Sequence, residues 1–499
     1  MGYHQLLFVL LVLTTATAQQ QPAMSCSYKG RGYLTSICVN AIPSLFRTTA
    51  YRFDNLDENL QCVNCTLQVI ESYTFDISGN QIKNLDLTDS KITILKPKSF
   101  MGLVFLEKLI LKDNQIVSVP AETFQGITKV KDLNMENNRV DGLVVNGFKE
   151  LANLRKLNLK SNNIKSIEDG SFNGLGSLEE LDLSNNEITT VNGIFTGLLN
   201  VRLINLEKNK ISKIDPLDVQ QLSVLLYLNL ARNNLKNILN NTFLELPRLE
   251  SLNLSSNPIE VIELGSFRGL DGLEELDMSS CLIETIQKGL LLTLHRLRLL
   301  NLSYNRLKVF KTGLFSGLPE LRKLNMSHNK ISTYEKTGIF PLHSLHNLDL
   351  SSNNLTDLDY KLLVDHLPAL SHIGLEDNPL PCYLKKEMEE IFKHDNLIFS
   401  LGAEAEDPNI KCATPIPVPP EDVTEEEIQR VTVKAPLRIE SSNGHQYVLY
   451  IFIAIALILM SLLFYLQYRN RSEINKMVGR TNVSETRLIS SELEDGDIY

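Results

Sequence analysis

The sequence predicts an α/β solenoid: a horseshoe-shaped stack of short coils with a parallel β-sheet on its concave face, disulfide-bonded ends and one transmembrane helix. Three observations support this fold. A pattern of leucines repeats thirteen times at a nearly fixed period. Six cysteines lie only before and after the repeats, and an uncharged apolar segment follows near the C-terminus. A fixed period of about 24 residues is typical of solenoids, in which each coil packs only on its neighbours.

Residues 1–18 are expected to be a secretory signal peptide. An apolar run at residues 6–13 is followed by small residues that end at Ala18, where cleavage is expected. No Lys or Arg precedes the run, which is atypical of such signals. The signal predicts an oxidising compartment, in which disulfides persist.

Residues 19–81 are interpreted as an N-terminal cap, because a bare terminal coil would expose its core. The cap contains four cysteines: Cys26, Cys38, Cys62 and Cys65. Four cysteines allow three disulfide pairings, and the sequence does not choose among them. A zinc site at Cys62 and Cys65 is the alternative, but no second cysteine pair follows at a zinc-site spacing.

Residues 82–380 contain thirteen copies of the pattern L-x-x-L-x-L-x-x-N-x-L. The alternation in L-x-L predicts a short strand whose leucines point into the stack. An Asn at the ninth position can donate and accept hydrogen bonds, so we expect it to link the turn to the neighbouring coil. Cys281 takes this position once, and we expect it to be unpaired. The ninth positions are Ser90, Asn114, Asn138, Asn162, Asn186, Asn209, Asn233, Asn257, Cys281, Asn305, Asn329, Asn353 and Asn378.

A second apolar column lies six residues before each copy and is mostly Phe. We interpret it as an aromatic spine beneath the returning arm of each coil. Burying one Leu or Phe contributes roughly 1.5–3 kcal/mol, whereas ordering one residue costs about 1–2 kcal/mol. A single copy therefore cannot fold alone, and only stacking makes folding favourable. The column consists of Phe100, Phe124, Phe148, Phe172, Phe195, Val219, Phe243, Phe267, Leu291, Phe315, Ile339 and Val364.

Residues 381–412 are interpreted as a C-terminal cap, in which Cys382 and Cys412 are the expected disulfide pair. Residues 413–446 are rich in Pro and acidic side chains, which favours an extended stalk.

Residues 447–468 are apolar and uncharged over a length that can span a bilayer. Arg469 and Arg471 follow at once and place the tail, residues 469–499, in the cytoplasm. The chain is thus expected to be a single-pass plasma-membrane protein with its N-terminus outside the cell. A buried helix of a soluble domain is the alternative interpretation of this segment.

Six glycosylation sequons lie on the predicted extracellular side. They are Asn64, Asn240, Asn253, Asn301, Asn325 and Asn354. Three of them, Asn253, Asn301 and Asn325, fall on predicted strands. Glycans there would crowd the C-terminal half of the concave face, so we expect a ligand to use the N-terminal and middle copies.

The concave face is predicted to bind protein. Charges alternate in sign along the copies, the net charge is −10, and no continuous basic stripe is present. Nucleic acid or a long sulfated polymer would require such a stripe. Leu203 and Tyr227 share one exposed position on adjacent strands, with Arg202 and Arg232 beside them, and Tyr and Arg are enriched in binding hot spots. Ordinary exposed surface is the alternative. A similar group lies beside a predicted glycan: Arg298, Leu299 and Tyr304.

No catalytic motif is present, and no cofactor or metal is expected. The chain is therefore not expected to be an enzyme. His328, His346 and His372 are expected to face the concave side, where pH sensing or metal binding is an alternative to scattered surface histidines.

The repeat pattern, the phenylalanine spine and the cysteine caps resemble the extracellular class of leucine-rich repeat proteins, from about Cys26 to Cys412. The ectodomain resembles that of Toll-type receptors. The whole layout is more similar to short-tailed, single-pass adhesion and recognition proteins, including insect neuronal adhesion and immune members. Such C-terminal caps often have two cysteine pairs rather than one, and the tail lacks the Toll-type signalling domain.

The resemblance implies one of two functions. The first is a cell-surface receptor or adhesion molecule that binds an extracellular protein or another ectodomain, homophilic or homodimeric contact included. The second is a non-signalling co-receptor, innate-immune recognition factor or shed decoy that sequesters its ligand. The fold itself does not distinguish them.

Overall fold

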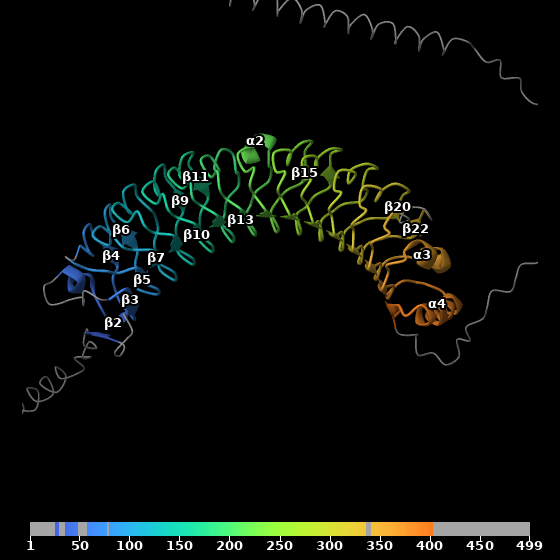
Figure 1. The fold of residues 1–499 in the computed structure, drawn as a ribbon, viewed down its shortest axis with the longest axis horizontal. Helices are drawn as coiled ribbons and strands as arrows, with labels where there is room; N and C mark the ends of the chain where they lie inside the picture. The colour runs from blue at the N-terminus through green and yellow to red at the C-terminus, as the bar shows by residue number, and fades with distance from the viewer. Residues whose placement is uncertain (1–24, 29–34, 48–56, 77–78, 336–340, 403–499) are drawn as a thin grey trace, which may run out of the picture. The chain divides into compact units, whose positions relative to one another are not determined.

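The structure is a computed structural model that describes residues 25–28, 35–47, 57–76, 79–335 and 341–402. These residues form a curved stack of coils with strands along its concave side (Figure 1). The predicted signal peptide, Ile339, Cys412, the stalk, the transmembrane segment 447–468 and the tail lie outside the described residues. Within the described part, no helix is long and apolar enough to cross a membrane.

One sheet of seventeen strands lines the concave face. All neighbouring strands pair in parallel except the first two, β1 and β2, which are antiparallel. The strands are β1 (Ser25–Tyr28), β2 (Thr35–Val39), β3 (Asn59–Val63), β5 (Asn84–Asp86), β7 (Lys108–Ile110), β8 (Asp132–Asn134), β10 (Lys156–Asn158), β12 (Glu180–Asp182), β13 (Leu203–Asn205), β14 (Tyr227–Asn229), β16 (Ser251–Asn253), β18 (Glu275–Asp277), β19 (Leu299–Asn301), β21 (Lys323–Asn325), β23 (Asn347–Asp349), β24 (His372–Gly374) and β25 (Ile398–Ser400).

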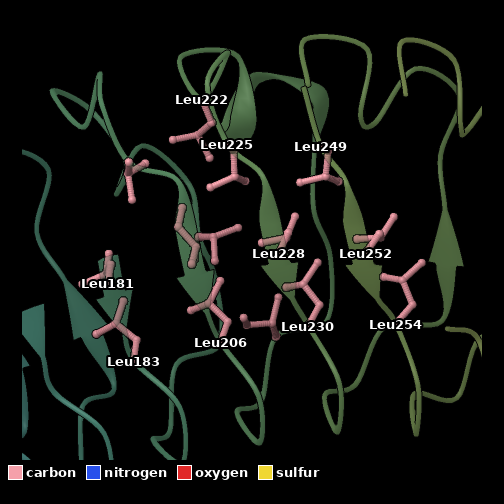
Figure 2. Packing of buried hydrophobic residues seen from close by; sticks show 14 of the residues in the cluster. Leu181, Leu183, Leu206, Leu222, Leu225, Leu228, Leu230, Leu249, Leu252 and Leu254 are labelled. Carbon is pink, nitrogen blue, oxygen red and sulfur yellow. The ribbon is translucent and has the colours of Figure 1, made fainter. Parts of the chain in front are cut away.

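Each of the thirteen predicted copies supplies one strand of this sheet, from β5 to β24, and every strand pairs in the same register. The fourth-position residues therefore form a column: Leu181 pairs with Ile204, and Ile204 pairs with Leu228. Figure 2 shows this column running beside that of the sixth position, which includes Leu206 and Leu230. All five side chains are buried, as the alternation of L-x-L predicts.

The stack continues into the segments interpreted as caps. Strands β2 and β3 precede the first copy, and β25 follows the last one in the same parallel ladder. The disulfides join Cys26 to Cys38 and Cys62 to Cys65, which selects one of the three pairings that the sequence left open. The alignment of Leu60 with Leu85 places Cys62 and Cys65 at the sixth and ninth positions of a coil. Cys382 is disulfide-bonded.

The convex side carries short strand pairs and a few helical turns. Four parallel two-stranded sheets lie there: β4 (Val69–Ile70) with β6 (Ile94–Leu95), β9 (Gly142–Leu143) with β11 (Ser166–Ile167), β15 (Asn237–Ile238) with β17 (Val261–Ile262), and β20 (Val309–Phe310) with β22 (Thr333–Tyr334). The helices are a 3-10 helix (Pro43–Arg47), α2 (Pro216–Val219), α3 (Tyr360–His366) and α4 (Cys382–His394). Figure 1 shows α2 at the crest of the arc.

The phenylalanine column forms the predicted spine. The rings of Phe75, Phe100, Phe124, Phe148 and Phe172 stack in sequence, with neighbouring centroids 5.8–6.3 Å apart. Phe46 of the cap packs on Phe75 at 5.2 Å. The column is filled by buried aliphatic side chains at Val219 and Leu291, whereas Val364 is only partly buried.

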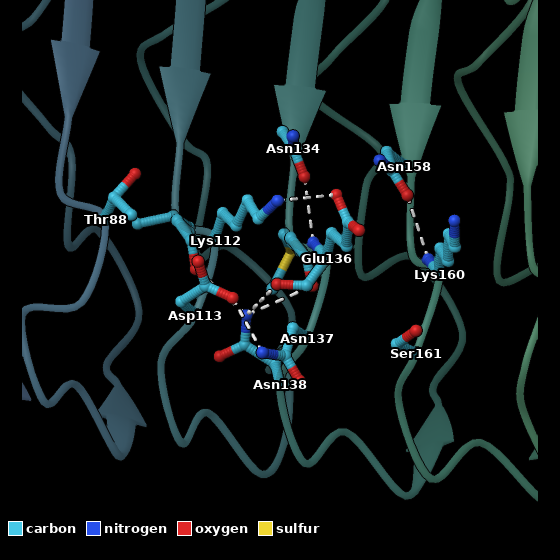
Figure 3. A network of polar contacts seen from close by, with 12 residues as sticks. Thr88, Lys112, Asp113, Asn134, Glu136, Asn137, Asn138, Asn158, Lys160 and Ser161 are labelled. Carbon is cyan, nitrogen blue, oxygen red and sulfur yellow. Dashed lines mark hydrogen bonds and ion pairs between the residues drawn. The ribbon is translucent and has the colours of Figure 1, made fainter.

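The ninth-position asparagines form a hydrogen-bonded ladder through the stack. The Asn138 Nδ2 donates to the carbonyls of Leu111, Met135 and Glu136, and its Oδ1 accepts from the Ile116 N–H at 3.0 Å. Part of this network is drawn in Figure 3. Each such Asn thus satisfies buried backbone groups of its own coil and of the preceding one.

Cys281 occupies the ninth position once and is unpaired, as the sequence predicted. Its thiol is free and buried, and its Sγ lies 3.6 Å from the Leu254 carbonyl oxygen. The Ile259 N–H, which an Asn at this position would bind, donates to the Asn257 carbonyl at 2.8 Å and also interacts with the Cys281 sulfur. Burial raises the pKa of the Cys281 thiol to about 11, so the thiol stays protonated at neutral pH.

Candidate functional site

The fifth-position side chains of the concave face are engaged in the turns that follow the strands. The Asn134 Oδ1 accepts from the Glu136 N–H at 2.9 Å, and the Asn158 Oδ1 accepts from the Lys160 N–H at 2.9 Å (Figure 3). Asp182 makes the same bond to the Ser184 N–H. This column is therefore structural, and the second and third positions carry most of the side chains that a ligand would meet.

Leu203 and Tyr227 are cross-strand neighbours, as the repeat pattern predicted. Leu203 is half-buried, whereas 45% of Tyr227 is exposed. The Tyr227 hydroxyl donates to the Glu250 Oε2 at 3.2 Å, and this bond raises the pKa of the phenol. The Tyr227 ring is thus held by its hydroxyl while its edge and face stay open to solvent.

The two predicted arginines lie apart. Arg202 directly precedes Leu203, one position before strand β13 begins. Arg232 lies beyond the end of β14, where its Nε is 3.5 Å from the Glu207 Oε1. The four predicted residues therefore form a group of three at the start of the strands, and Arg232 belongs to the opposite edge of the sheet.

The eighth position, which Arg232 occupies, has a left-handed backbone in every copy. Asn, Asp and Ser fill it in nine copies, and Asn and Asp tolerate this conformation best. Large side chains occur at Lys208, Arg232, Tyr304 and His328, with φ between 52° and 57°. The rings of Tyr304 and His328 stack with centroids 4.1 Å apart. Strained positions that carry large exposed side chains are frequent at binding surfaces. The column is Asp89, Asp113, Asn137, Ser161, Asn185, Lys208, Arg232, Ser256, Ser280, Tyr304, His328, Ser352 and Asp377.

A polar hollow of about 520 Å³ is lined in part by Arg202 and Leu226, which directly precede Leu203 and Tyr227 in the sequence. It spans copies four to seven, and we call it the arginine hollow. Three of its lining residues, Arg155, Arg202 and Arg248, are exposed arginines. The full lining is Asn153, Arg155, Ser177, Glu179, Asn200, Arg202, Val224, Leu226 and Arg248.

Sequence reasoning found Arg202 and missed the hollow. Arg248 directly precedes its copy of the leucine pattern, and Asn153, Ser177 and Asn200 precede theirs in the same way. The leucine pattern does not predict which way a side chain at that position points. Aligning the residues before each copy would have shown Arg248 one coil beyond Leu226, although not that the surface is hollowed.

A second hollow, of about 490 Å³, lies on the C-terminal strands β19 to β25. Its lining includes Leu299, Gly374 and Ile398, so it is more apolar than the arginine hollow. Gly374 stands at the fifth position, and a Cβ there would lie 2.7 Å from the Asp349 Oδ1. The sequon residues Asn301 and Asn325 also line this hollow.

The remaining sequons divide by exposure. Asn64, Asn240 and Asn354 are exposed, whereas Asn253 is half-buried on the sheet like Asn301 and Asn325. The amide of Asn301 is engaged, because its Nδ2 donates to the Asp277 Oδ2 at 3.2 Å. Crowding of the C-terminal half by glycans stays a prediction.

The three concave histidines do not form one group. His346, His372 and His328 take the second, third and eighth positions of their copies. The described residues contain no cluster of three His, Cys, Asp or Glu side chains that could hold a metal ion.

Comparisons with known proteins agree with the fold. The family model described as "Leucine rich repeat" matches residues 80–140, 105–164, 152–211, 223–283 and 273–331. A leucine-rich repeat protein of Leptospira interrogans is 22% identical, with a TM-score of 0.61, over 73% of this chain and 89% of that one. The leucine-rich repeat domain of APL1 is 21% identical, with a TM-score of 0.56, over 71% and 90%. No curated protein matches the chain by sequence.

These structural likenesses concern the fold alone. The repeats in the sequence, the parallel ladder of strands and the asparagine ladder all point to the same superfamily as the family match. The chain belongs to the leucine-rich repeat superfamily.

Proposed function

We propose that the chain is a cell-surface receptor or adhesion molecule that binds a protein ligand on its concave face. The observation that carries this proposal is the cross-strand pair of half-buried Leu203 and exposed Tyr227, which directly follow Arg202 and Leu226 of the arginine hollow. Leucine-rich repeat domains are in general protein-interaction modules, and the extended surface of a solenoid suits a large partner. A Tyr and an Arg beside an apolar side chain are the residue types that dominate binding energy in protein interfaces.

A binding screen of the displayed full chain against secreted proteins and ectodomains would identify the partner. The Leu203→Ala, Tyr227→Ala double variant is then expected to weaken binding by about 30-fold, as loss of a hot spot of about 2 kcal/mol would do. The dissociation constant would be measured by surface plasmon resonance. Neither side chain is part of the core, so folding is expected to be unchanged in circular dichroism.

A matched control lies in copy ten. Leu299 occupies the same third position as Leu203, and Tyr304 is 56% exposed. The Leu299→Ala, Tyr304→Ala double variant is expected to change affinity less than twofold. If this variant lost binding and the first one kept it, the C-terminal hollow would be the ligand site.

The location at the plasma membrane and the sequestering alternative are tested on cells. A tag at residue 25 is expected to be stained on intact cells, and a tag at residue 499 only after permeabilisation. The reverse staining would overturn the predicted orientation.

A cell-aggregation assay separates adhesion from sequestering. Clustering of suspended cells that express the chain supports adhesion. Binding of a soluble ligand without clustering supports a co-receptor or decoy.

A further inference from the structure

We propose that the arginine hollow is a receptor site for an acidic segment of a protein partner, in which Arg202 and Arg248 bind carboxylates. The inference rests on the proposed function, since it names the chemistry of the ligand that the concave face would bind. It is carried by three observations: the hollow itself, the two arginines without ion partners, and the Leu203–Tyr227 pair that directly follows two of its lining residues.

Four second-position residues form the floor of the hollow and lie on consecutive coils. The Glu179 N–H donates to the Arg155 carbonyl, the Arg202 N–H to the Glu179 carbonyl and the Leu226 N–H to the Arg202 carbonyl, each at 2.8 Å. Neighbouring coils in a parallel sheet are about 4.8 Å apart, so these four residues lie in a row along the stack.

Elsewhere along the second-position column, several basic residues pair with acidic residues of the adjacent coil, whereas Arg322 in copy eleven has no ion partner among the described residues. Lys131 pairs with Glu107 at 2.7 Å, and Arg298 pairs with Glu274 at 2.6 Å. Arg155 and Glu179 form a looser pair at 3.6 Å. These pairs show that the column tends to neutralise its own charges.

Arg202 is the exception inside the hollow. On one side is Glu179, which Arg155 already engages, and on the other side is Leu226, which carries no charge. Neither Arg202 nor Arg248 has an ion partner among the described residues. The hollow thus presents three guanidinium groups against one carboxylate in a chain whose net charge is −10.

A carboxylate is the ligand group that this arrangement recognises best. The planar guanidinium donates two parallel hydrogen bonds to a carboxylate, and these bonds are stronger in a recess than on open surface. Leu203 and Tyr227, which directly follow Arg202 and Leu226, would contact an apolar residue of the same segment.

The test uses the purified full chain and a hexaglutamate peptide, with hexaserine as the uncharged probe. We expect binding of hexaglutamate that weakens at least tenfold in the Arg202→Glu, Arg248→Glu double variant and falls as salt rises. Arg322→Glu is the control: Arg322 is exposed, occupies the second position of copy eleven and has no ion partner among the described residues. It is expected to change affinity less than twofold.

Three outcomes would overturn the proposal: no binding of hexaglutamate by the wild type, equal losses in the double variant and the control, or tighter binding of a heparin oligosaccharide or single-stranded RNA than of the peptide. Failure of the proposed function is distinguishable from these. A partner that still requires Tyr227 but is indifferent to Arg202→Glu would leave protein binding intact and remove only the carboxylate site.

Discussion

Copies two to five and the copies that follow them differ in how strictly they keep the columns of the repeat. From Asn114 to Asn186, every ninth position is Asn, every spine position is Phe and every eighth position is Asp, Asn or Ser. After Asn186, each of the three columns is broken. The exceptions are Lys208, Val219, Arg232, Cys281, Leu291, Tyr304, His328, Ile339 and Val364.

The Leu203–Tyr227 pair lies where this irregular region begins. The only step of 23 residues between ninth positions runs from Asn186 to Asn209, and α2 occupies the next outer arm. In a regular coil, the residues of the three columns serve stability alone. A coil that departs from these columns therefore satisfies a requirement other than packing. The comparison teaches that the repeat is kept most strictly in copies two to five, and that large exposed side chains at the eighth position occur only in the copies beyond them.

The largest expected effect on stability comes from substitutions in the spine column, which differs between the two regions. Phe148→Ala removes a ring stacked on both sides and should lower the free energy of unfolding by about 3–5 kcal/mol. Val219→Ala removes about two methyl groups and should cost about 2 kcal/mol. Native-state hydrogen exchange would measure both, coil by coil. Equal losses at the two positions would show that the stacked spine adds nothing beyond ordinary burial.

Replacing Cys281 in the asparagine ladder is expected to have an intermediate effect on stability. Cys281→Asn should give the Ile259 N–H an amide oxygen as acceptor in place of the weaker sulfur, and should raise the free energy of unfolding by about 1 kcal/mol at pH 7. Denaturant titrations of the variant and the wild type at pH 7 would measure the gain. A lower midpoint for the variant would show that the coil has adapted to the smaller side chain.

The same substitution predicts a pH dependence. The pKa of the buried thiol is raised from 9.0 to about 11, so the unfolded chain releases this proton at a lower pH than the folded chain. Stability from the protonated thiol is therefore complete below pH 9 and is lost as pH rises toward 11, by about 1.4 kcal/mol per pH unit within that window. The wild type should lose more stability than Cys281→Asn between pH 9 and pH 11. Parallel curves for the two proteins would contradict a buried, protonated thiol.

The smallest expected effect concerns the left-handed eighth column. Lys208→Asn and Arg232→Asn should each raise the free energy of unfolding by about 1 kcal/mol, because Asn tolerates φ values near 57° better than long side chains do. The exposed Arg232–Glu207 pair contributes little that would be lost. Asn185→Lys is the matched reverse change in a regular copy and should lower stability by a similar amount. Thermal unfolding would compare the three variants, and unchanged values would mean that the column stores no strain.

The periodic features of the fold follow from the sequence because each one is repeated thirteen times. The strand at every copy, the buried leucine columns and the place of Cys281 in the asparagine ladder were all predicted from spacing and then found. Features that occur once were not. The pairing of Cys26 with Cys38 depends on the antiparallel register of β1 and β2, which no repeat specifies.

The candidate site divides in the same way. The register of the sheet brings Leu203 beside Tyr227, and spacing alone predicted this contact. Arg232 follows Tyr227 by five residues and lies past the end of the strand, so nearness in sequence was misleading. Arg248 lies directly before the leucine pattern, where the spacing does not predict which way a side chain points. The hollow that it lines was missed for the same reason.

The uniform strand register has a mechanical consequence. Bonds between neighbouring strands point along the stack, so a pull on its two ends loads every interface in series, and the weakest one yields first. A coil of 24 residues occupies about 4.8 Å of the packed sheet but extends to roughly 80 Å when drawn out. Releasing one coil after another would lengthen the molecule in large, separate steps and limit the tension on any ligand held at its middle.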